Sequence, residues 1–288
     1  MIDIADIADT AAQRPASPEE TLAPEALGFY RQSMNLLKEA QVPFLVGGAY
    51  AFTRYTGIVR HTKDFDVFVH PRDFGRALDA FSQSGYEVSR SFPYWLGKAF
   101  QGDDFVDVIF SSGNCVAKVD EQWFEHAPDD EVLSVPAQLV PAEEMIWSKA
   151  FIMERERFDG ADIAHILHSR FADLDWQRLL DRFGDNWRIL LTHLLLFGFI
   201  YPDDADRIPV RTMDSLLDKV KKETRIGGPA GPDGRLCRGP LLSRSQYLVD
   251  VEEWGYRDAR LEPDGSMSAD DIAHWTAAAR EEEAKRQH

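Results

Sequence analysis

The chain has 288 residues, of which 44% are hydrophobic, so it can form a substantial core in one large domain or two smaller ones. The formal net charge of −17 makes the surface acidic, which disfavours binding to the phosphate backbone of DNA. The two cysteines, Cys115 and Cys237, form no Cys-x-x-Cys pair, so neither a disulfide framework nor a zinc site is expected, and a reducing cytoplasm is favoured.

Residues 1–24 mix Asp, Ala, Pro and Ser and predict a loose N-terminal extension that lacks the basic start of a secretory signal. Residues 25–140 then carry the pattern of an α/β domain. Apolar residues at helical spacing predict helices, and short apolar runs predict strands. The expected helices cover 24–40, 49–55 and 71–84, and the expected strands cover 43–46, 65–69, 86–90 and 105–110. This alternation indicates a small mixed sheet flanked by helices.

From residue 141 to residue 226 the pattern predicts a helical domain, with helices over 141–153, 159–170, 175–183 and 187–199. The longest apolar run, residues 189–200, is too short to cross a bilayer and predicts a buried helix, so no membrane partner is expected. The Gly- and Pro-rich stretch 227–234 predicts a flexible break, and residues up to 288 follow as a C-terminal extension.

Two glycines, Gly47 and Gly48, stand where the first predicted strand gives way to a helix. At such a turn backbone N–H groups are exposed, and the helix dipole favours an anion. Taken alone, the pair is better explained as a tight strand-to-helix turn.

Three aspartates suggest a metal site. Asp64 and Asp66 lie two positions apart at the second predicted strand, so their side chains point to the same face. Oxygen-rich carboxylate sites suit Mg²⁺. Asp107 interrupts the apolar run 105–110 and is costly to bury without a partner. If that strand lies beside the second one, the three carboxylates form a cluster able to bind two Mg²⁺ ions.

In this order the diglycine turn, the Asp64-x-Asp66 pair and Asp107 resemble the nucleotidyltransferase superfamily, which has the DNA polymerase beta-like fold. The resemblance implies transfer of a nucleoside monophosphate from an NTP to an acceptor hydroxyl, with release of pyrophosphate. It implies that Asp64 and Asp66 hold both metal ions and that Asp107 holds the catalytic one. By the same resemblance, Gly47 and Gly48 bring backbone amides to the triphosphate.

A second segment, residues 143–163, is similar to part of the AbiEii-like and related small bacterial nucleotidyltransferases. That resemblance implies that Lys149 neutralises triphosphate charge and that Asp162 positions Lys149 or the acceptor. Together the two resemblances cover residues 41–167. Ala49 departs from the pattern, because many relatives have a serine there whose hydroxyl touches a phosphate.

Other interpretations of the charged residues near the aspartates stay open. Arg60 and Lys63 flank the first two aspartates and could bind phosphate, or could only neutralise those carboxylates at the surface. Asp107 could pair with a buried arginine, which would make it a structural residue.

The charged residues of the helical segment also allow a second interpretation. Lys149 could be a solvated helix residue. Asp162 could belong to an ion-paired helix start together with Arg157 and Asp159. Neither residue would then contact a nucleotide.

The acceptor stays open among small molecules, proteins and RNA, and the acidic charge favours the first two classes. Two alternatives remain. The chain could be the toxin component of a toxin–antitoxin pair, modifying tRNA or protein and binding an antitoxin. It could also be a non-catalytic nucleotide-binding module, although such a module would be free to lose one of the three aspartates.

Overall fold

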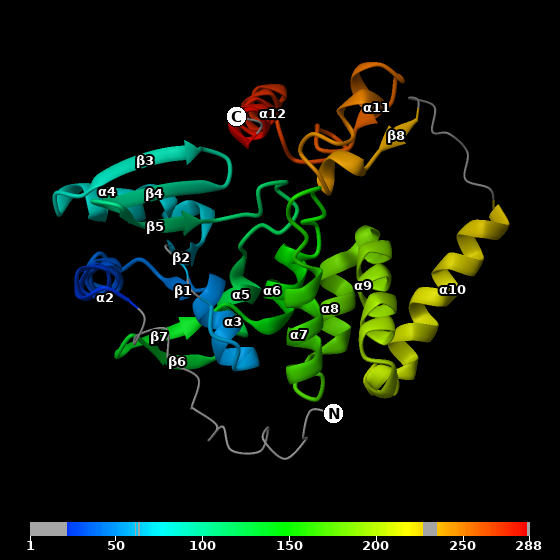
Figure 1. Cartoon of the computed structure of the whole chain (residues 1–288), viewed down its shortest axis with the longest axis horizontal. Coiled ribbons are helices and arrows are strands. Elements are labelled where there is room, and N and C mark those ends of the chain that lie inside the picture. The colour runs from blue at the N-terminus through cyan, green and yellow to red at the C-terminus, as the bar shows by residue number, and fades with distance from the viewer. Residues whose placement is uncertain (1–21, 61, 63, 227–234, 287–288) are drawn as a thin grey trace, which may run out of the picture.

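The computed structural model describes residues 22–60, 62, 64–226 and 235–286 (Figure 1). The helices are α2 (Pro24–Glu39), α3 (Gly48–Thr56), α4 (Phe74–Gln83), α5 (Glu121–Glu125), α6 (Ala142–Lys149), α7 (Gly160–Arg170), α8 (Trp176–Phe183), α9 (Trp187–Ile200), α10 (Val210–Ile226), α11 (Leu248–Glu252) and α12 (Ala269–Arg286). The strands are β1 (Phe44–Val46), β2 (Asp64–Val69), β3 (Glu87–Phe92), β4 (Leu96–Gln101), β5 (Asp104–Ile109), β6 (Asp129–Val132), β7 (Val135–Leu139), β8 (Leu236–Cys237) and β9 (Arg257–Asp258). Residues 1–21 and 227–234, for which the sequence predicts a loose extension and a flexible break, lie outside the described residues, as does Lys63.

Seven strands form one mixed sheet, in the order β3-β4-β5-β2-β1-β7-β6. β2 is parallel to β5 and β1 is parallel to β7, whereas the other neighbours in this sheet are antiparallel. A mixed sheet flanked by helices confirms the predicted fold class. The sheet is larger than predicted, because β4 is inserted between β3 and β5 and the β6–β7 hairpin extends the sheet beyond β1.

The two faces of the sheet differ along β2, where fully buried and partly exposed residues alternate. Phe65 and Val67 are buried on the face that α2 covers, and the ring of Tyr30 from α2 stacks on Phe65 with centroids 5.1 Å apart. Asp64 and Asp66 point to the opposite face, because side chains alternate along a strand. The start of α3 lies against that opposite face.

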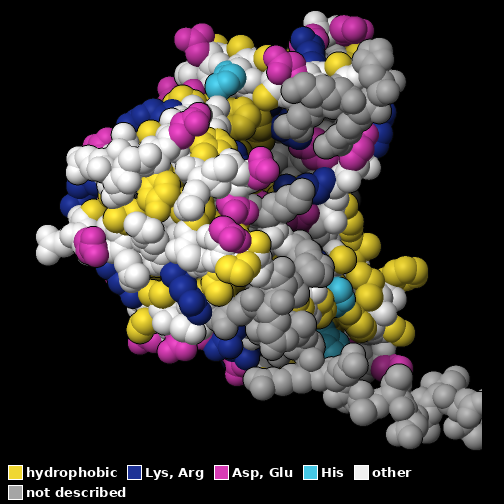
Figure 2. Space-filling model, turned by 60° about the vertical axis from the view of Figure 1, so that its left-hand side comes forward, with side chains coloured by type: hydrophobic (Ala, Val, Ile, Leu, Met, Phe, Trp, Pro, Cys, Tyr) yellow, Lys and Arg dark blue, Asp and Glu magenta, His cyan; other side chains and the backbone are white. Residues whose placement is uncertain are grey.

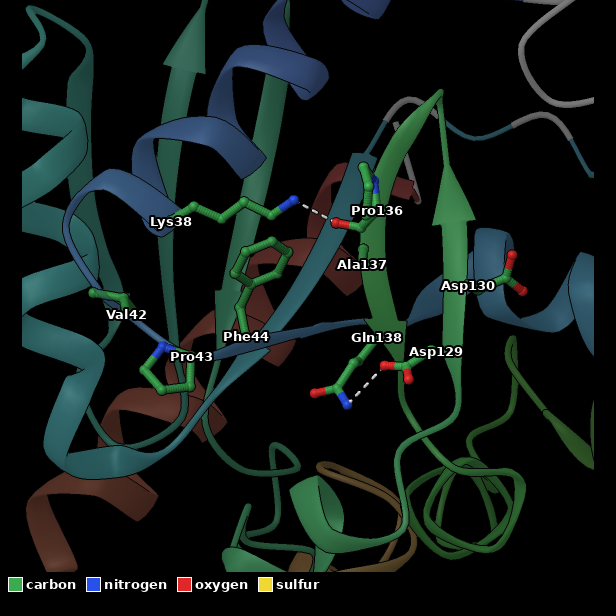
Figure 3. A pocket seen from close by; sticks show the side chains of 9 residues that line it. All are labelled: Lys38, Val42, Pro43, Phe44, Asp129, Asp130, Pro136, Ala137 and Gln138. Carbon is green, nitrogen blue, oxygen red and sulfur yellow. Dashed lines mark hydrogen bonds between the residues drawn. The ribbon is translucent and has the colours of Figure 1, made fainter.

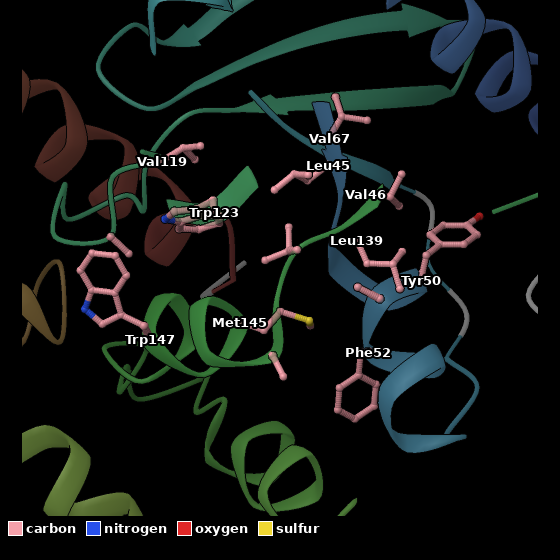
Figure 4. Packing of buried hydrophobic residues seen from close by; sticks show 14 of the residues in the cluster. Leu45, Val46, Tyr50, Phe52, Val67, Val119, Trp123, Leu139, Met145 and Trp147 are labelled. Carbon is pink, nitrogen blue, oxygen red and sulfur yellow. The ribbon is translucent and has the colours of Figure 1, made fainter. Parts of the chain in front are cut away.

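One continuous apolar core joins the sheet to the helices that follow it. Figure 4 shows Leu45 and Val46 of β1, Leu139 of β7 and Met145 of α6 gathered in this core, and all four are buried. Protein interiors are close-packed, so elements that share a core hold fixed positions relative to one another. The core therefore fixes α6 against the strands that carry the acidic residues.

Buried ion pairs also fix α6 to α8. Glu144 is fully buried, and its carboxylate accepts hydrogen bonds from Arg178 at 2.6 Å and from Arg182 at 2.8 Å. Arg178 also donates to Glu143 at 2.5 Å. A buried charge without a partner is costly, so each member of this group depends on the others. The two glutamates therefore anchor the helix that ends at Lys149.

Two predictions for the helical part are wrong. α6 ends at Lys149 and does not cover 141–153, because the chain then turns so that Met153 can bridge Phe158. α9 is not a buried helix, since only one of its faces packs inward and Phe199 is 84% exposed. Within the described ranges, the structure contains no helix with the length and apolar character needed to cross a membrane.

Candidate active site

Three carboxylates converge on the face of the sheet opposite α2. Asp66 of β2 and Asp107 of β5 are register partners on adjacent parallel strands, and Asp64 lies two residues before Asp66 on the same face. Each offers a carboxylate oxygen within 4.8 Å of those of the other two. The structure thus brings together the three acidic side chains named from the sequence, and we call them the acid triad. Hard oxygen donors at this spacing suit Mg²⁺ or Mn²⁺.

Burial and mutual repulsion act together on the acid triad. The pKa of Asp66 is raised to about 7, first by burial and then by the charges of Asp64 and Asp107. Burial also raises the pKa of Asp107, although the ammonium of Lys98 opposes this rise. A divalent cation among the three carboxylates would stabilise their ionised forms, so the electrostatics of the site favour one.

The diglycine turn brings the start of α3 against the acid triad. Gly48 has a left-handed φ of 54°, and a Cβ there would lie 1.7 Å from Oδ2 of Asp66. A Cβ on Gly47 would lie 2.3 Å from the ring of Phe68. Both positions therefore require glycine. At Gly48 the backbone lies directly against the Asp66 carboxylate. The first turn of a helix presents backbone N–H groups and favours an anion.

Gly48→Ala is expected to lower the free energy of unfolding by about 3 kcal/mol, because the new methyl group must displace the Asp66 carboxylate as well as strain the backbone. Gly57→Ala is the matched control. Gly57 has a φ of 73°, but a Cβ there would have no neighbouring atom within 4 Å. The control should therefore cost about 1 kcal/mol, from backbone strain alone. Urea unfolding measures both costs, and equal values would contradict the close approach to Asp66.

A network of alternating charges begins at the end of α6. Lys149 lies 3.0 Å from a carboxylate oxygen of Asp159 and 2.9 Å from one of Asp162. Arg157 pairs with Asp159 at 3.0 Å, and Arg60 pairs with Asp162 at 2.5 Å. We call these five residues the ion-pair network. It holds three cations in place with two carboxylates, so one net positive charge remains.

The ion-pair network lies within electrostatic range of the acid triad. The positive charge of Lys149 opposes the burial-driven rise in the pKa of Asp66. The pKa of Arg157 is raised, chiefly by its hydrogen bond to Asp159 and in part by the charge of Asp66. Carboxylates and cations thus stand close together, an arrangement that suits a ligand carrying both phosphate groups and a divalent ion.

The structure narrows the alternatives for the basic residues. Arg60 is held by Asp162 rather than by the acid triad, and its guanidinium carbon lies 4.3 Å from the centroid of the Phe52 ring. The side chain of Lys149 is 19% exposed and is paired twice, so it is not a freely solvated helix residue. Lys63, the other basic residue named beside the aspartates, lies outside the described residues.

Lys98 enters the site from β4, a strand that the sequence pattern did not predict. Its Nζ lies 2.6 Å from Oδ1 of Asp107. The partner of Asp107 is therefore a lysine from the adjacent strand and not a buried arginine. The signal in the sequence was a single lysine inside a short, largely apolar stretch, which is too weak to identify without the strand pairing.

A separate groove of about 370 Å³ lies beside β1 and β7 (Figure 3). Lys38 crosses it and donates to the backbone oxygen of Pro136, and Gln138 donates to Asp129 at 3.1 Å. Among the described residues that line the groove, none belongs to the acid triad or to the ion-pair network. The groove is therefore distinct from the candidate active site.

Comparison with solved structures finds similar folds at low sequence identity. The antibiotic-resistance factor ANT(2'')-Ia is 16% identical, with a TM-score of 0.43 over 60% of this chain and 98% of that chain. An antigenic nucleotidyltransferase-like protein from Paracoccidioides brasiliensis is 15% identical, with a TM-score of 0.42 over 65% of this chain and 93% of that chain. The lincosamide antibiotic adenylyltransferase LnuA, bound to lincomycin, is 10% identical, with a TM-score of 0.37 over 50% of this chain and 96% of that chain. No family model and no curated protein sequence matches the chain.

Proposed function

We propose that this chain is a divalent-metal-dependent nucleotidyltransferase, which moves a nucleoside monophosphate from an NTP to an acceptor hydroxyl and releases pyrophosphate. The proposal rests on the acid triad, in which three carboxylates from two adjacent strands each offer an oxygen within 4.8 Å of those of the other two. The start of a helix lies so close to it that only glycine fits at residue 48. Carboxylate oxygens are the donors that Mg²⁺ prefers, and a helix start favours phosphate.

Each member of the acid triad has a role in this proposal. Asp64, Asp66 and Asp107 would hold Mg²⁺, which when bound stabilises the phosphate charge and lowers the pKa of the acceptor hydroxyl. The acceptor oxygen bonds to the α-phosphorus, and the bond from that phosphorus to the pyrophosphate oxygen breaks. Asp107 would accept the proton that leaves the hydroxyl, since a buried carboxylate with a raised pKa is a competent base.

The triphosphate would lie between the diglycine turn and the ion-pair network. The backbone N–H of Gly48 would bind its oxygens, whereas that of Gly47 donates to the backbone oxygen of Asp66. Lys149 and Arg157 would neutralise the charge of the triphosphate. Ala49 offers no hydroxyl to a phosphate, so the cations would contribute a larger share of the binding. An NTP substrate and two free cysteines fit a cytoplasmic location.

Lys149→Ala is expected to raise the KM for NTP by roughly tenfold or more, because a charge-assisted contact to phosphate is lost. The kcat should change less, since Lys149 contacts the substrate in the ground state as well as in the transition state. Lys149→Arg keeps the charge and should recover part of the affinity. Steady-state kinetics at varied NTP concentrations measure both constants, and an unchanged KM in the alanine variant would remove Lys149 from the NTP site.

The class of the acceptor can be identified with an NTP that carries a radioactive label at its α-phosphate. We would incubate the protein with Mg²⁺, a cell extract and each NTP labelled at the α-phosphate, and then separate small molecules, protein and RNA. Figure 2 shows acidic side chains scattered among basic and hydrophobic ones on the face it presents, and the chain has a net charge of −17, so we expect label in small molecules or protein. Label in tRNA would favour the toxin alternative. Binding of NTP without any transfer would favour a non-catalytic module and overturn the proposal.

A further inference from the structure

Lys98 stands at one end of a polar row that crosses the sheet. Lys98 of β4 is the register partner of Asp107 on β5, and Asp107 is the register partner of Asp66 on β2. The backbone N–H of Gly47 donates to the backbone oxygen of Asp66 at 3.0 Å and continues the row. Side chains in register across a sheet project from the same face. The ammonium of Lys98 therefore flanks the acid triad on the side away from the diglycine turn.

Two contacts hold this ammonium in place. Nζ of Lys98 lies 2.6 Å from Oδ1 of Asp107 and 4.0 Å from the centroid of the Phe105 ring. The Lys98 side chain is only 23% exposed. A charge-assisted hydrogen bond and a cation–π contact on a partly buried side chain give a fixed position, unlike that of a lysine on an open surface.

The position of Lys98 changes how many divalent ions the acid triad can balance. The three carboxylates carry a charge of −3 when ionised. The ammonium of Lys98 contributes one positive charge, so the net charge of these four groups is −2. One divalent ion neutralises that remainder. A second ion would need further negative charge, and the phosphates of an NTP are the source that the proposed reaction supplies.

We propose that Lys98 is a built-in cation of the acid triad, which restricts the nucleotide-free protein to one divalent ion and makes binding of the second depend on the triphosphate. The inference rests on the proposed nucleotidyl transfer, because it takes the acid triad as a metal site. Lys98 is a positioning residue in this scheme. It acts through Asp107, because its ammonium donates a hydrogen bond to one of the two carboxylate oxygens of that residue.

Mn²⁺ titration of the full chain tests this inference without any acceptor. At about pH 8, above the pKa of about 7 of Asp66, calorimetry and the spin-resonance signal of free Mn²⁺ give affinity and stoichiometry. We expect the wild-type protein to bind one ion alone. It should bind a second in the presence of a non-hydrolysable NTP analogue, after subtraction of the ions that the analogue binds by itself. Lys98→Met should bind Mn²⁺ about tenfold more tightly, or bind two ions without nucleotide, because a fixed cation has been removed.

Two further variants distinguish the loss of a positive charge beside the acid triad from the loss of a positive charge elsewhere on the protein. Lys98→Arg keeps the cation and should bind one ion, as the wild type does. Lys221→Met removes an exposed lysine paired with Asp218 on α10, and it should leave Mn²⁺ binding unchanged. If Lys98→Met does not fold, Lys98→Gln removes the same charge with a polar side chain, and its Mn²⁺ stoichiometry without nucleotide decides the matter.

The outcomes distinguish this inference from the proposed function. Two ions bound by the wild type without nucleotide, or unchanged binding in Lys98→Met, would overturn the role of Lys98 and leave the acid triad as a metal site. An absence of Mn²⁺ binding by the wild type, with and without nucleotide, would overturn the proposed function as well.

Discussion

Asp66→Asn is expected to abolish nucleotidyl transfer and, at the same time, to make the metal-free protein more stable. The loss of a metal-binding carboxylate should lower kcat by about a thousandfold or more, since the bound ion is expected to contribute several kcal/mol to the transition state. Asparagine has nearly the same shape as aspartate, so the packing against Gly48 is retained. The gain in stability arises because the variant no longer carries a charge that burial and like charges disfavour.

The gain in stability should depend on pH in a defined direction. The pKa of Asp66 is about 7 in the folded protein and lies near the ordinary value of 3.8 in the unfolded chain. Between these values the folded state holds a proton that the unfolded state has lost, so wild-type stability falls as pH rises and reaches its low plateau above about pH 7. The variant has no such group. It should be more stable than the wild type by on the order of 4 kcal/mol at about pH 8, and this difference should shrink towards pH 4.

Thermal unfolding of both proteins across this pH range, with and without Mn²⁺, measures the effect. Mn²⁺ should stabilise the wild type strongly and the variant weakly, which reverses the order seen without metal. A variant that is less stable than the wild type at every pH would mean that the Asp66 carboxylate is well accommodated without a cation, and would count against the acid triad as a metal site.

Arg178→Met is expected to have the largest effect on folding, lowering the free energy of unfolding by about 3–5 kcal/mol. Glu144 is fully buried, and Arg178 donates to both of its carboxylate oxygens at 2.6 Å. Without Arg178, this buried charge would keep only the hydrogen bond from Arg182. Because Glu144 lies on α6, the variant should also raise the KM for NTP through Lys149. Urea unfolding and steady-state kinetics measure the two effects.

The matched control is Arg280→Met, which breaks a pair with Glu252 whose two side chains are 58% and 55% exposed. That change should cost less than about 1 kcal/mol, because water screens exposed pairs. Adding Glu144→Gln to Arg178→Met should recover part of the lost stability, since it removes the uncompensated charge. If Arg178→Met costs no more than Arg280→Met, the buried pairs do not anchor α6.

The acid triad could be predicted from the sequence because its members stand out from their surroundings. Asp107 is a charge inside a strongly apolar strand, and Asp64 and Asp66 begin another. The order of the strands in the sheet could not be inferred from the sequence. The parallel pairing of β2 with β5, which places Asp66 opposite Asp107, follows from the whole sheet and not from either segment.

Lys98 and the added strands could not be predicted for a related reason. In β4 the apolar run is interrupted by Gly97 and Lys98. Gly97 is needed there because a Cβ would lie 2.9 Å from the side chain of Leu78 on α4, which is a tertiary requirement. The β6–β7 hairpin contains acidic residues and Pro136, and it forms where β7 pairs with β1. Tertiary pairing thus overrides weak local propensity in each case.

Parallel reactions with NTP labelled at the α-phosphate or at the γ-phosphate test the function of the acid triad most directly. With the wild-type protein, Mg²⁺ and the responding extract fraction, we expect α-label in the acceptor and γ-label only in released pyrophosphate. Removal of the metal by a chelator, or the change Asp66→Asn, should stop the transfer. Appearance of γ-label in the acceptor, or α-label transfer that persists in Asp66→Asn, would contradict nucleotidyl transfer at this site.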